Sequence, residues 1–427
     1  MMQELKPVEW LGNTRVLKGQ VSPFVRQMFP QGITKTARDF HKQIPGYTMS
    51  PLKNLPRLAS MLGLGGIWVK DESNRLRLGS FKVLGGSFAI YQIIRQRLGM
   101  MDRELTFEEL TSPEIRAALG EVVFAAATDG NHGRGVAWSA NQLGFRSVIY
   151  VHKMTSETRI KAIENNGAEV VVVDGTYDDA VRQVNLDAQR NGWQVIADTA
   201  WEGYEDIPRW VIQGYSTMFA ETQEQLAAQG LIAPTHIFAQ AGVGSLAAAT
   251  IGYYANLFGS ERPTSVVVEP ELAACLYRSA EINDGAPHNF DGDLDTIMAG
   301  LACGEPNPQA WEILQDTADV FVKCPDYVAA KGMRVYAIPL SGDPFIVSGE
   351  SGAVSLGALT FIMEMPELAP LREKLGLGKN SQVLLINSER NTDPDDFRRV
   401  VWEGGSAVPR QYRKFHSGLG RDPQKAN

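Results

Sequence analysis

The sequence is poor in cysteine and in the spacings that bind metals. Only three of its 427 residues are cysteine, which is too few for a disulfide scaffold. It contains no C-x-x-C or H-E-x-x-H pattern, so no zinc site is predicted. The G-x-S-x-G turn of serine hydrolases and the P-loop motif of nucleotide-binding proteins are absent as well. Metal-dependent hydrolysis, serine hydrolysis and P-loop chemistry therefore lose their usual supports.

Positive charge and long apolar runs are also scarce. The formal net charge of -8 does not attract a phosphate backbone, so nucleic-acid binding is not expected. The most apolar stretch, 237–258, is broken by three glycines, and the first residues do not resemble a secretory signal. We therefore expect a cytoplasmic protein that does not cross a membrane. With 44% hydrophobic and 21% charged residues, the chain is expected to be globular, with two or three lobes.

Short apolar runs alternate with helical patterns along most of the chain. Near-continuous apolar strands separated by helices indicate parallel sheets covered on both faces, the doubly wound α/β class. We predict a large lobe made of residues 1–92 and 232–427, and a small lobe made of residues 93–231. Ligands in such folds bind beyond the carboxyl ends of strands, so the functional residues are expected in the loops there. The expected strands are 122–127, 147–151, 169–173, 195–197, 235–241, 265–269, 320–322 and 382–387.

Two of the candidate loops contain groups that could react. In Ser80-Phe81-Lys82, Ser80 can cap a helix, which places Lys82 in the first turn, where the helix dipole favours an uncharged, nucleophilic amine. An ordinary surface lysine is the alternative. The stretch 128–135 follows a strand and opens a helix, so its N–H groups suit a carboxylate. His132 within it could be an acid or base, or a packed and hydrogen-bonded histidine.

Two further loops contain anion-binding and hydroxyl groups. Residues 242–247 (GVGSLA) follow a strand and form a glycine-rich turn, which is suited to a phosphate. They also match the dinucleotide-binding pattern G-x-G-x-x-G/A, and Glu269 lies roughly where a ribose-binding acid would. A nicotinamide-dependent dehydrogenase is therefore an alternative. The polar loop 387–391 follows the last strand. A reactive lysine, two anion cradles and a hydroxyl are together the parts that pyridoxal phosphate needs.

The chain resembles the fold-type II pyridoxal-phosphate enzymes in the motifs SFK (80–82), DGNHG (129–133) and GVGS (242–245). Longer blocks are similar to the diaminopropionate ammonia-lyase family in particular. They are ATDGNHGRGVAW (127–138), DTAWEGY (198–204), QAGVGSLAAA (240–249), IMAGLACGEPNP (297–308), SGESGAV (348–354) and VVWEG (400–404). The resemblance implies two parallel-sheet domains with the cofactor between them, a homodimer, and conversion of 2,3-diaminopropionate to pyruvate and two ammonia.

The resemblance also implies roles for individual residues. Lys82 is expected to form the Schiff base, and Gly242, Val243, Gly244 and Ser245 to hold the phosphate. Asn131 is expected to bond the pyridine O3′, and Ser388 to face the ring nitrogen. The residues expected around the substrate are Thr128, Asp129, Gly130, His132 and Asp198.

Asp129 marks a departure from the dehydratases of this fold, which typically have serine at that position. This departure favours a diamino substrate, because a carboxylate can accompany the β-ammonium group as it leaves. Lys82 lies on one face of the bound substrate, so we expect Lys82 and Asp129 to act as bases on opposite faces.

Three alternatives remain open from the sequence. They are a serine or threonine dehydratase of the same fold, a nicotinamide-dependent dehydrogenase, and a non-catalytic cofactor-binding protein. Cys275 and Cys303 flank a loop between Glu271 and Gly304 that the family places near the entrance of the active site. A disulfide between Cys275 and Cys303 is therefore a further hypothesis, with two separate thiols as its alternative.

Overall fold

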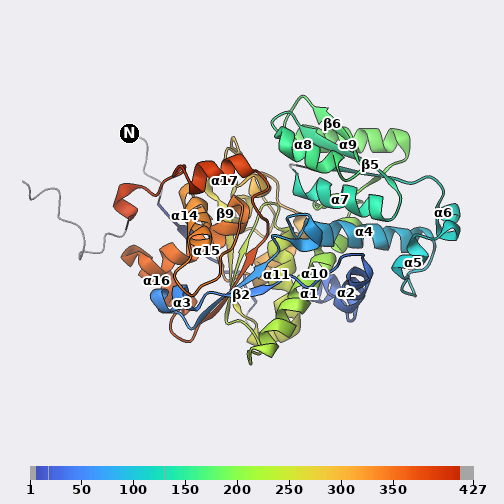
Figure 1. Ribbon diagram of the computed structural model, residues 1–427. Helices are drawn as coiled ribbons and strands as arrows, with labels where there is room; N and C mark the ends of the chain where they lie inside the picture. Colours follow the sequence, from blue (N-terminus) through green and yellow to red (C-terminus); the bar gives the residue numbers. More distant parts are fainter. Residues whose placement is uncertain (1–5, 18, 129, 414–427) are drawn as a thin grey trace, which may run out of the picture.

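The computed structural model describes residues 6–17, 19–128 and 130–413. Asp129, which the sequence predicts as a base, therefore lies outside the described residues. The described part of the chain forms two sheets with helices around them (Figure 1).

The larger sheet has seven strands in the order β1-β10-β9-β8-β11-β3-β2, and the smaller has four in the order β6-β5-β4-β7. The smaller sheet is parallel throughout, whereas edge strands β1 and β2 of the larger sheet run antiparallel to their neighbours. The doubly wound α/β prediction is confirmed, with these two edges as additions. The strands are β1 Glu9–Gly12, β2 Leu52–Asn54, β3 Gly66–Asp71, β4 Val123–Thr128, β5 Arg146–His152, β6 Glu169–Val173, β7 Gln194–Val195, β8 His236–Gln240, β9 Thr264–Pro270, β10 Val320–Cys324 and β11 Gln382–Asn387.

Helices cover both faces of the larger sheet, because alternate residues of its strands are apolar on both sides. In β11, Leu384 and Ile386 join the core that includes α11, whereas Val383 and Leu385 join the core that includes α14 and α15. The helices are α1 Pro23–Met28, α2 Ile33–Gln43, α3 Pro56–Leu62, α4 Lys82–Arg97, α5 Phe107–Leu110, α6 Pro113–Leu119, α7 Asn131–Gln142, α8 Glu157–Glu164, α9 Tyr177–Asn191, α10 Asp206–Ala228, α11 Ser245–Phe258, α12 Cys275–Ile282, α13 Pro308–Thr317, α14 Asp326–Ala337, α15 Glu350–Glu364, α16 Ala369–Leu375 and α17 Pro394–Val401.

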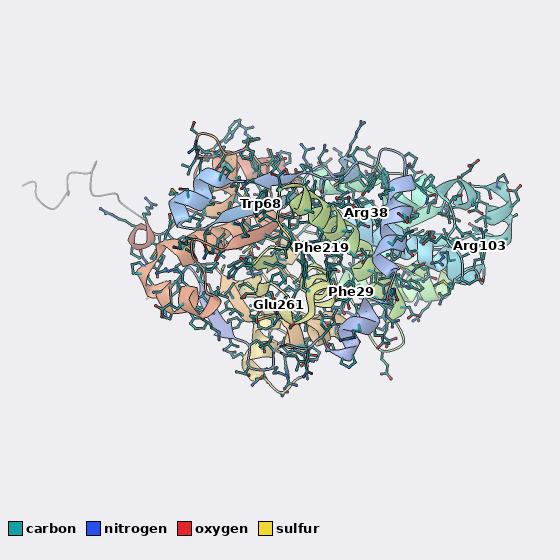
Figure 2. All side chains as sticks on the ribbon, turned by 90° about the horizontal axis from the view of Figure 1, so that it is seen from below. Phe29, Arg38, Trp68, Arg103, Phe219 and Glu261 are labelled. Carbon is teal, nitrogen blue, oxygen red and sulfur yellow. The ribbon has the colours of Figure 1, made fainter. Side chains whose placement is uncertain are left out.

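The smaller sheet lies beside α4, and α7 separates the two (Figure 1). Close packing there depends on glycine, since a methyl group on Gly135 of α7 would lie 3.0 Å from the Val83 backbone. On its other side, α4 packs against the long helix α10, which also contacts α2. Arg38 of α2 and Phe219 of α10 are labelled in Figure 2, which shows this side of the molecule; Arg38 forms an ion pair with Glu224 of α10.

No single helix in the described ranges has the length and apolar character needed to cross a membrane. Within these ranges, only α15 taken together with the helical segment 366–375 has the required length and apolar character, and the chain bends by 98° between the two. The residues of α15 are almost all buried, in the core that also includes α14.

Candidate active site

The structure has a cavity of about 1160 Å³ at the carboxyl ends of the strands of both sheets. It brings together most of the residues that the sequence singles out. Those that line it are Lys82, Thr128, Asn131, His132, Asp198, Gly242, Val243, Gly244, Ser245 and Ser388. Gly130 is buried but is not part of the lining.

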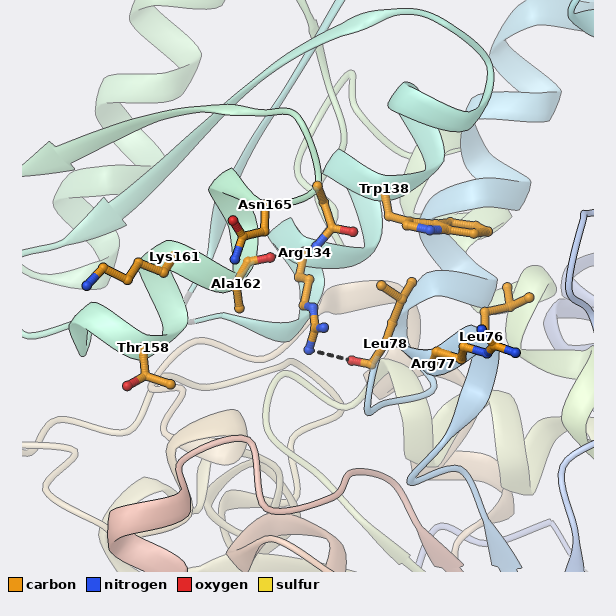
Figure 3. A pocket seen from close by; sticks show the side chains of 10 residues that line it. Leu76, Arg77, Leu78, Arg134, Trp138, Thr158, Lys161, Ala162 and Asn165 are labelled. Carbon is orange, nitrogen blue, oxygen red and sulfur yellow. Dashed lines mark hydrogen bonds between the residues drawn. The ribbon is translucent and has the colours of Figure 1, made fainter.

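A second, more open cavity of about 620 Å³ lies between α7, α8 and the segment before Gly79 (Figure 3). Arg134 crosses it and donates to the Leu78 carbonyl at 2.9 Å, as the dashed line in Figure 3 marks. Lys82 and the glycine-rich turn do not line this second cavity, so the first one is the candidate active site.

Lys82 is the first residue of α4, as the sequence predicts, but Ser80 does not cap the helix. Instead, Ser80 pairs with Glu389 in an isolated antiparallel bridge, and the Phe81 N–H donates to the Ser388 carbonyl at 3.1 Å. The loop that contains the lysine is thus tied to the loop after β11. This pairing holds Lys82 and Ser388 in one cavity although they are far apart in the sequence.

Asp198, from the loop after β7, is a partner of Lys82. The Lys82 Nζ donates to Asp198 Oδ2 at 2.5 Å, and the carboxylate is 9% exposed. Burial acts to raise the pKa of Asp198, but the charges of Lys82 and His132 and the hydrogen bond from Lys82 outweigh it, so the pKa lies below its usual value. Asp198 is therefore a carboxylate at neutral pH, in direct contact with the predicted reactive amine.

The glycine-rich turn opens α11 on another side of the cavity. Gly244 has φ +103°, a left-handed conformation that favours glycine. A methyl group on Gly242 would lie 3.1 Å from Cys303 Sγ and from the Leu301 Cα. The Ser245 hydroxyl donates to the Asp198 carbonyl at 2.6 Å, so its hydrogen is already used. An anion bound at this turn would therefore be held by the backbone N–H groups of the first turn of α11.

The turn between β4 and α7 is held by a side chain. The Thr128 hydroxyl accepts the N–H groups of Gly130 at 2.8 Å and Gly133 at 3.0 Å, so Thr128 shapes the loop. Asn131, the first residue of α7, donates from Nδ2 to Glu389 Oε2 at 2.6 Å. Its amide is therefore fixed at the edge of the cavity by a carboxylate that sequence reasoning did not single out.

His132 is packed and hydrogen-bonded on one side only. Its Nε2 lies 2.8 Å from the Ile196 carbonyl, which can only accept, so Nε2 bears a hydrogen. Nδ1 is buried and has no hydrogen-bond partner among the residues that the structure describes. The imidazole therefore has an unused ring nitrogen and lies close to Asp198.

Two buried amides that complete the site were missed by sequence reasoning. Asn307, just before α13, donates to the Asp198 carbonyl at 3.1 Å and to Ser245 Oγ at 3.0 Å, which joins the two loops. Gln240, the last residue of β8, donates to Ser388 Oγ at 3.0 Å. Asn307 lies in one of the sequence blocks that carry the family resemblance, which was the available signal.

Glu269 does not face the glycine-rich turn as a ribose-binding acid would. Its carboxylate accepts the N–H groups of Leu276 at 2.8 Å and Tyr277 at 2.7 Å, at the start of α12. Burial raises its pKa to about 8 although these two hydrogen bonds act in the opposite direction. The observation that kept a dehydrogenase open is therefore explained by helix capping.

Cys275 and Cys303 both lie against Gly242, but no disulfide joins them. Burial, and then the neighbouring charges of Glu269 and Cys303, raise the pKa of the Cys275 thiol. The two cysteines therefore lie near each other, as the hypothesis expects, but the disulfide itself is not present in this structure. No group of three or more His, Cys, Asp or Glu residues within the described ranges is arranged to hold a metal ion.

These residues fit pyridoxal phosphate. An amine projects into the cavity, and a helix N-terminus whose cradle a Cβ atom would fill can receive a phosphate. The Ser388 hydroxyl has no acceptor among the described residues, so it can donate to a ring nitrogen. The cavity thus offers a partner for the aldehyde, the phosphate and the ring nitrogen of that cofactor.

Comparisons with known proteins agree with this assignment. The model of the family "Pyridoxal-phosphate dependent enzyme" matches residues 44–389. Diaminopropionate ammonia-lyase of Escherichia coli K12 is 47% identical over 93% of this chain and 97% of its own. Its crystal structure in complex with D-serine has a TM-score of 0.87 at 45% identity, covering 94% of this chain and 98% of that one. A probable D-serine dehydratase of an Acidovorax species is 24% identical over 73% of this chain and 74% of its own. The chain belongs to the pyridoxal-phosphate dependent enzymes and, within them, to the diaminopropionate ammonia-lyase family.

Proposed function

We propose that this protein uses pyridoxal phosphate to convert 2,3-diaminopropionate and water to pyruvate and two molecules of ammonia. The observation that carries the proposal is the amine of Lys82 at the first turn of α4, in one cavity with the glycine cradle and the Ser388 hydroxyl. When bound, the cofactor supplies an electron sink for negative charge at the substrate Cα. The residues described below bind, orient and move protons.

Lys82 is the group we propose for covalent attachment of the cofactor and for removal of the Cα proton of one substrate isomer. Asp198, 2.5 Å from its Nζ, holds the lysine in place and accepts its hydrogen bond. Asp129 is proposed as the base on the opposite face of the substrate. The β-amine leaves as ammonia once it has received a proton, and the released three-carbon enamine takes up water to give pyruvate and the second ammonia.

The charge of the cavity supports a diamino substrate over a hydroxy amino acid. Carboxylates outnumber lysine and arginine side chains among the described residues that line it, so a second ammonium group is favoured there. The lining carboxylates are Asp198, Asp293, Asp295, Glu305, Glu389, Asp393 and Asp396, and the lining lysine and arginine residues are Lys82, Lys153 and Arg159. A serine or threonine dehydratase has no comparable use for this excess of negative charge.

Product stoichiometry tests the reaction. Two ammonia per pyruvate from diaminopropionate, with much lower rates on serine and threonine, are the expected result. Equal or faster turnover of serine, with one ammonia per pyruvate, would establish the dehydratase instead.

Substitution of Lys82 tests the site. Lys82→Ala is expected to fold but to lose nearly all activity, because no neighbouring side chain replaces the covalent amine. Borohydride reduction followed by peptide mass spectrometry should find the cofactor on Lys82. A label on Lys153, which also lines the cavity, would contradict the assignment.

We also propose the lobe boundaries 1–92 with 232–427 and 93–231, a homodimer, and a cytoplasmic location. The separation of the two sheets supports the lobes, and the resemblance to the family supports the dimer. Light scattering of the purified protein tests the oligomeric state.

A further inference from the structure

Gln240 is a fully buried amide in the lining of the cavity. It ends β8 and reaches towards β11 and α15. Its Nε2 donates to the Ile386 carbonyl at 2.9 Å and to Ser388 Oγ at 3.0 Å, and its Oε1 accepts from Ser355 Oγ at 3.2 Å. Every polar atom of the Gln240 side chain is thus hydrogen-bonded.

The orientation of this amide is fixed by the backbone of β11. A carbonyl oxygen can only accept, so the atom of Gln240 that faces Ile386 must be the NH₂ group. Turning the amide over would set its oxygen against the Ile386 carbonyl and its NH₂ group against Ser355. The second hydrogen of Nε2 therefore points to Ser388 Oγ, which must accept it.

The direction of the Ser388 hydroxyl follows from this. Its oxygen receives the hydrogen of Gln240, so its own hydrogen is directed to another acceptor, and none is present among the described residues. Ser388 lines the cavity and is 4% exposed. A group bound there meets a hydroxyl that donates.

We propose that Gln240 is a positioning residue that presents the Ser388 hydroxyl as a hydrogen-bond donor to the pyridine nitrogen of the cofactor, so that this nitrogen carries no proton. The inference rests on the proposed function. If Gln240 were apolar, the Ser388 hydroxyl could donate to the Ile386 carbonyl and accept from a protonated ring nitrogen instead. Gln240 would then act on the electron-withdrawing strength of the cofactor through Ser388.

Nitrogen-15 NMR of the protein loaded with ring-labelled pyridoxal phosphate tests the first half of the inference without any substitution. The expected signal of the wild-type protein is that of an unprotonated ring nitrogen that accepts a hydrogen bond, throughout the pH range in which the protein is folded. A protonated ring nitrogen at neutral pH would overturn the inference.

The variant Gln240→Met tests the second half. Methionine has nearly the same length and no amide, so the ring nitrogen should take up a proton at a pH higher by about one unit or more, as expected when a hydrogen bond selects one protonation state. Gln213→Met is the matched control: Gln213 is also buried, donates to the Met28 carbonyl at 2.7 Å and does not line the cavity. Its ring-nitrogen signal should equal that of the wild type.

A double variant shows whether Gln240 acts through Ser388. In a Ser388→Ala background, Gln240→Met should cause no further shift of the ring-nitrogen signal. An equal shift with and without Ser388, or none in Gln240→Met, would overturn the inference even if diaminopropionate is still cleaved. Failure of the wild-type protein to bind the cofactor or to cleave diaminopropionate would instead overturn the proposed function, and this inference with it.

Discussion

The ion pair between Lys82 and Asp198 connects the chemistry of the site with its stability. We predict that Asp198→Asn lowers kcat/KM about 10- to 100-fold, since one charged hydrogen bond to the reactive amine is lost. In the cofactor-free protein, the depressed pKa of Asp198 also stabilises the fold above the pKa of the unfolded carboxyl. The difference in unfolding free energy between wild type and Asp198→Asn should be full above about pH 4 and shrink as the pH falls. Urea titrations at several pH values measure it, and a difference that grows in acid would contradict the pairing.

Asp129 permits a test that separates the two proposed bases. Asp129→Asn is expected to abolish elimination from D-diaminopropionate and to spare part of the activity on the L-isomer, for which Lys82 remains. Losing a general base typically costs about 10²- to 10⁴-fold, so the contrast between isomers is measurable by steady-state kinetics. Equal, modest losses for both isomers would show that the carboxylate does not act on one face only.

At the scale of elements, Glu269 links the end of β9 to the first turn of α12. Its pKa of about 8 means that the folded protein retains a proton that the unfolded chain releases near pH 4.5. The wild-type unfolding free energy should therefore fall, relative to that of Glu269→Gln, by up to about 1.4 kcal/mol per pH unit between these values. Thermal unfolding of both proteins from pH 5 to 8 checks this sign; parallel curves would show that the carboxyl ionises normally.

The elements also show how far sequence reasoning reaches. The strand-turn-helix units that contain Asn131 and the GVGS turn were predictable, because apolar runs and glycines lie next to one another in the chain. Strand β3 was not predicted, since its apolar run is short and ends before Lys70 and Asp71, and the Glu221 carboxylate that pairs with Lys70 lies 151 positions away. Asn307 was not predicted either, because its partner Asp198 lies 109 positions away in the sequence.

Considered as a whole, the molecule is joined across α10 and the larger sheet by a fully buried set of charges. Glu221 of α10 accepts from Lys70 of β3 at 2.6 Å and from Arg75 at 2.7 Å. Burial acts to raise the pKa of Glu221, but these two cations hold it at about 2. The set has no access to water, so each charge depends on the others for its compensation.

Removing one member should therefore cost far more than removing an exposed ion pair. Glu221→Gln is predicted to lower the unfolding free energy by about 3–5 kcal/mol, because Lys70 then remains buried without a carboxylate and Arg75 keeps only that of Glu72. Glu224→Gln is the control, because the Glu224 side chain is 54% exposed and pairs with Arg38. This substitution should lower the unfolding free energy by less than about 1 kcal/mol. Urea unfolding measures both, and similar losses would mean that the buried set adds nothing beyond a surface pair.

The placement of the three cysteines gives the molecule a natural reporter of cofactor occupancy. Cys275 and Cys324 are fully buried, and burial raises the pKa of both thiols, so they should not react with alkylating reagents. Cys303 is only half-buried, and its sulfur lies against Gly242 in the phosphate cradle. A maleimide should therefore add a single label, at Cys303, and a filled cradle should slow that reaction. The mass of the intact chain would then distinguish loaded from empty protein without any engineered probe.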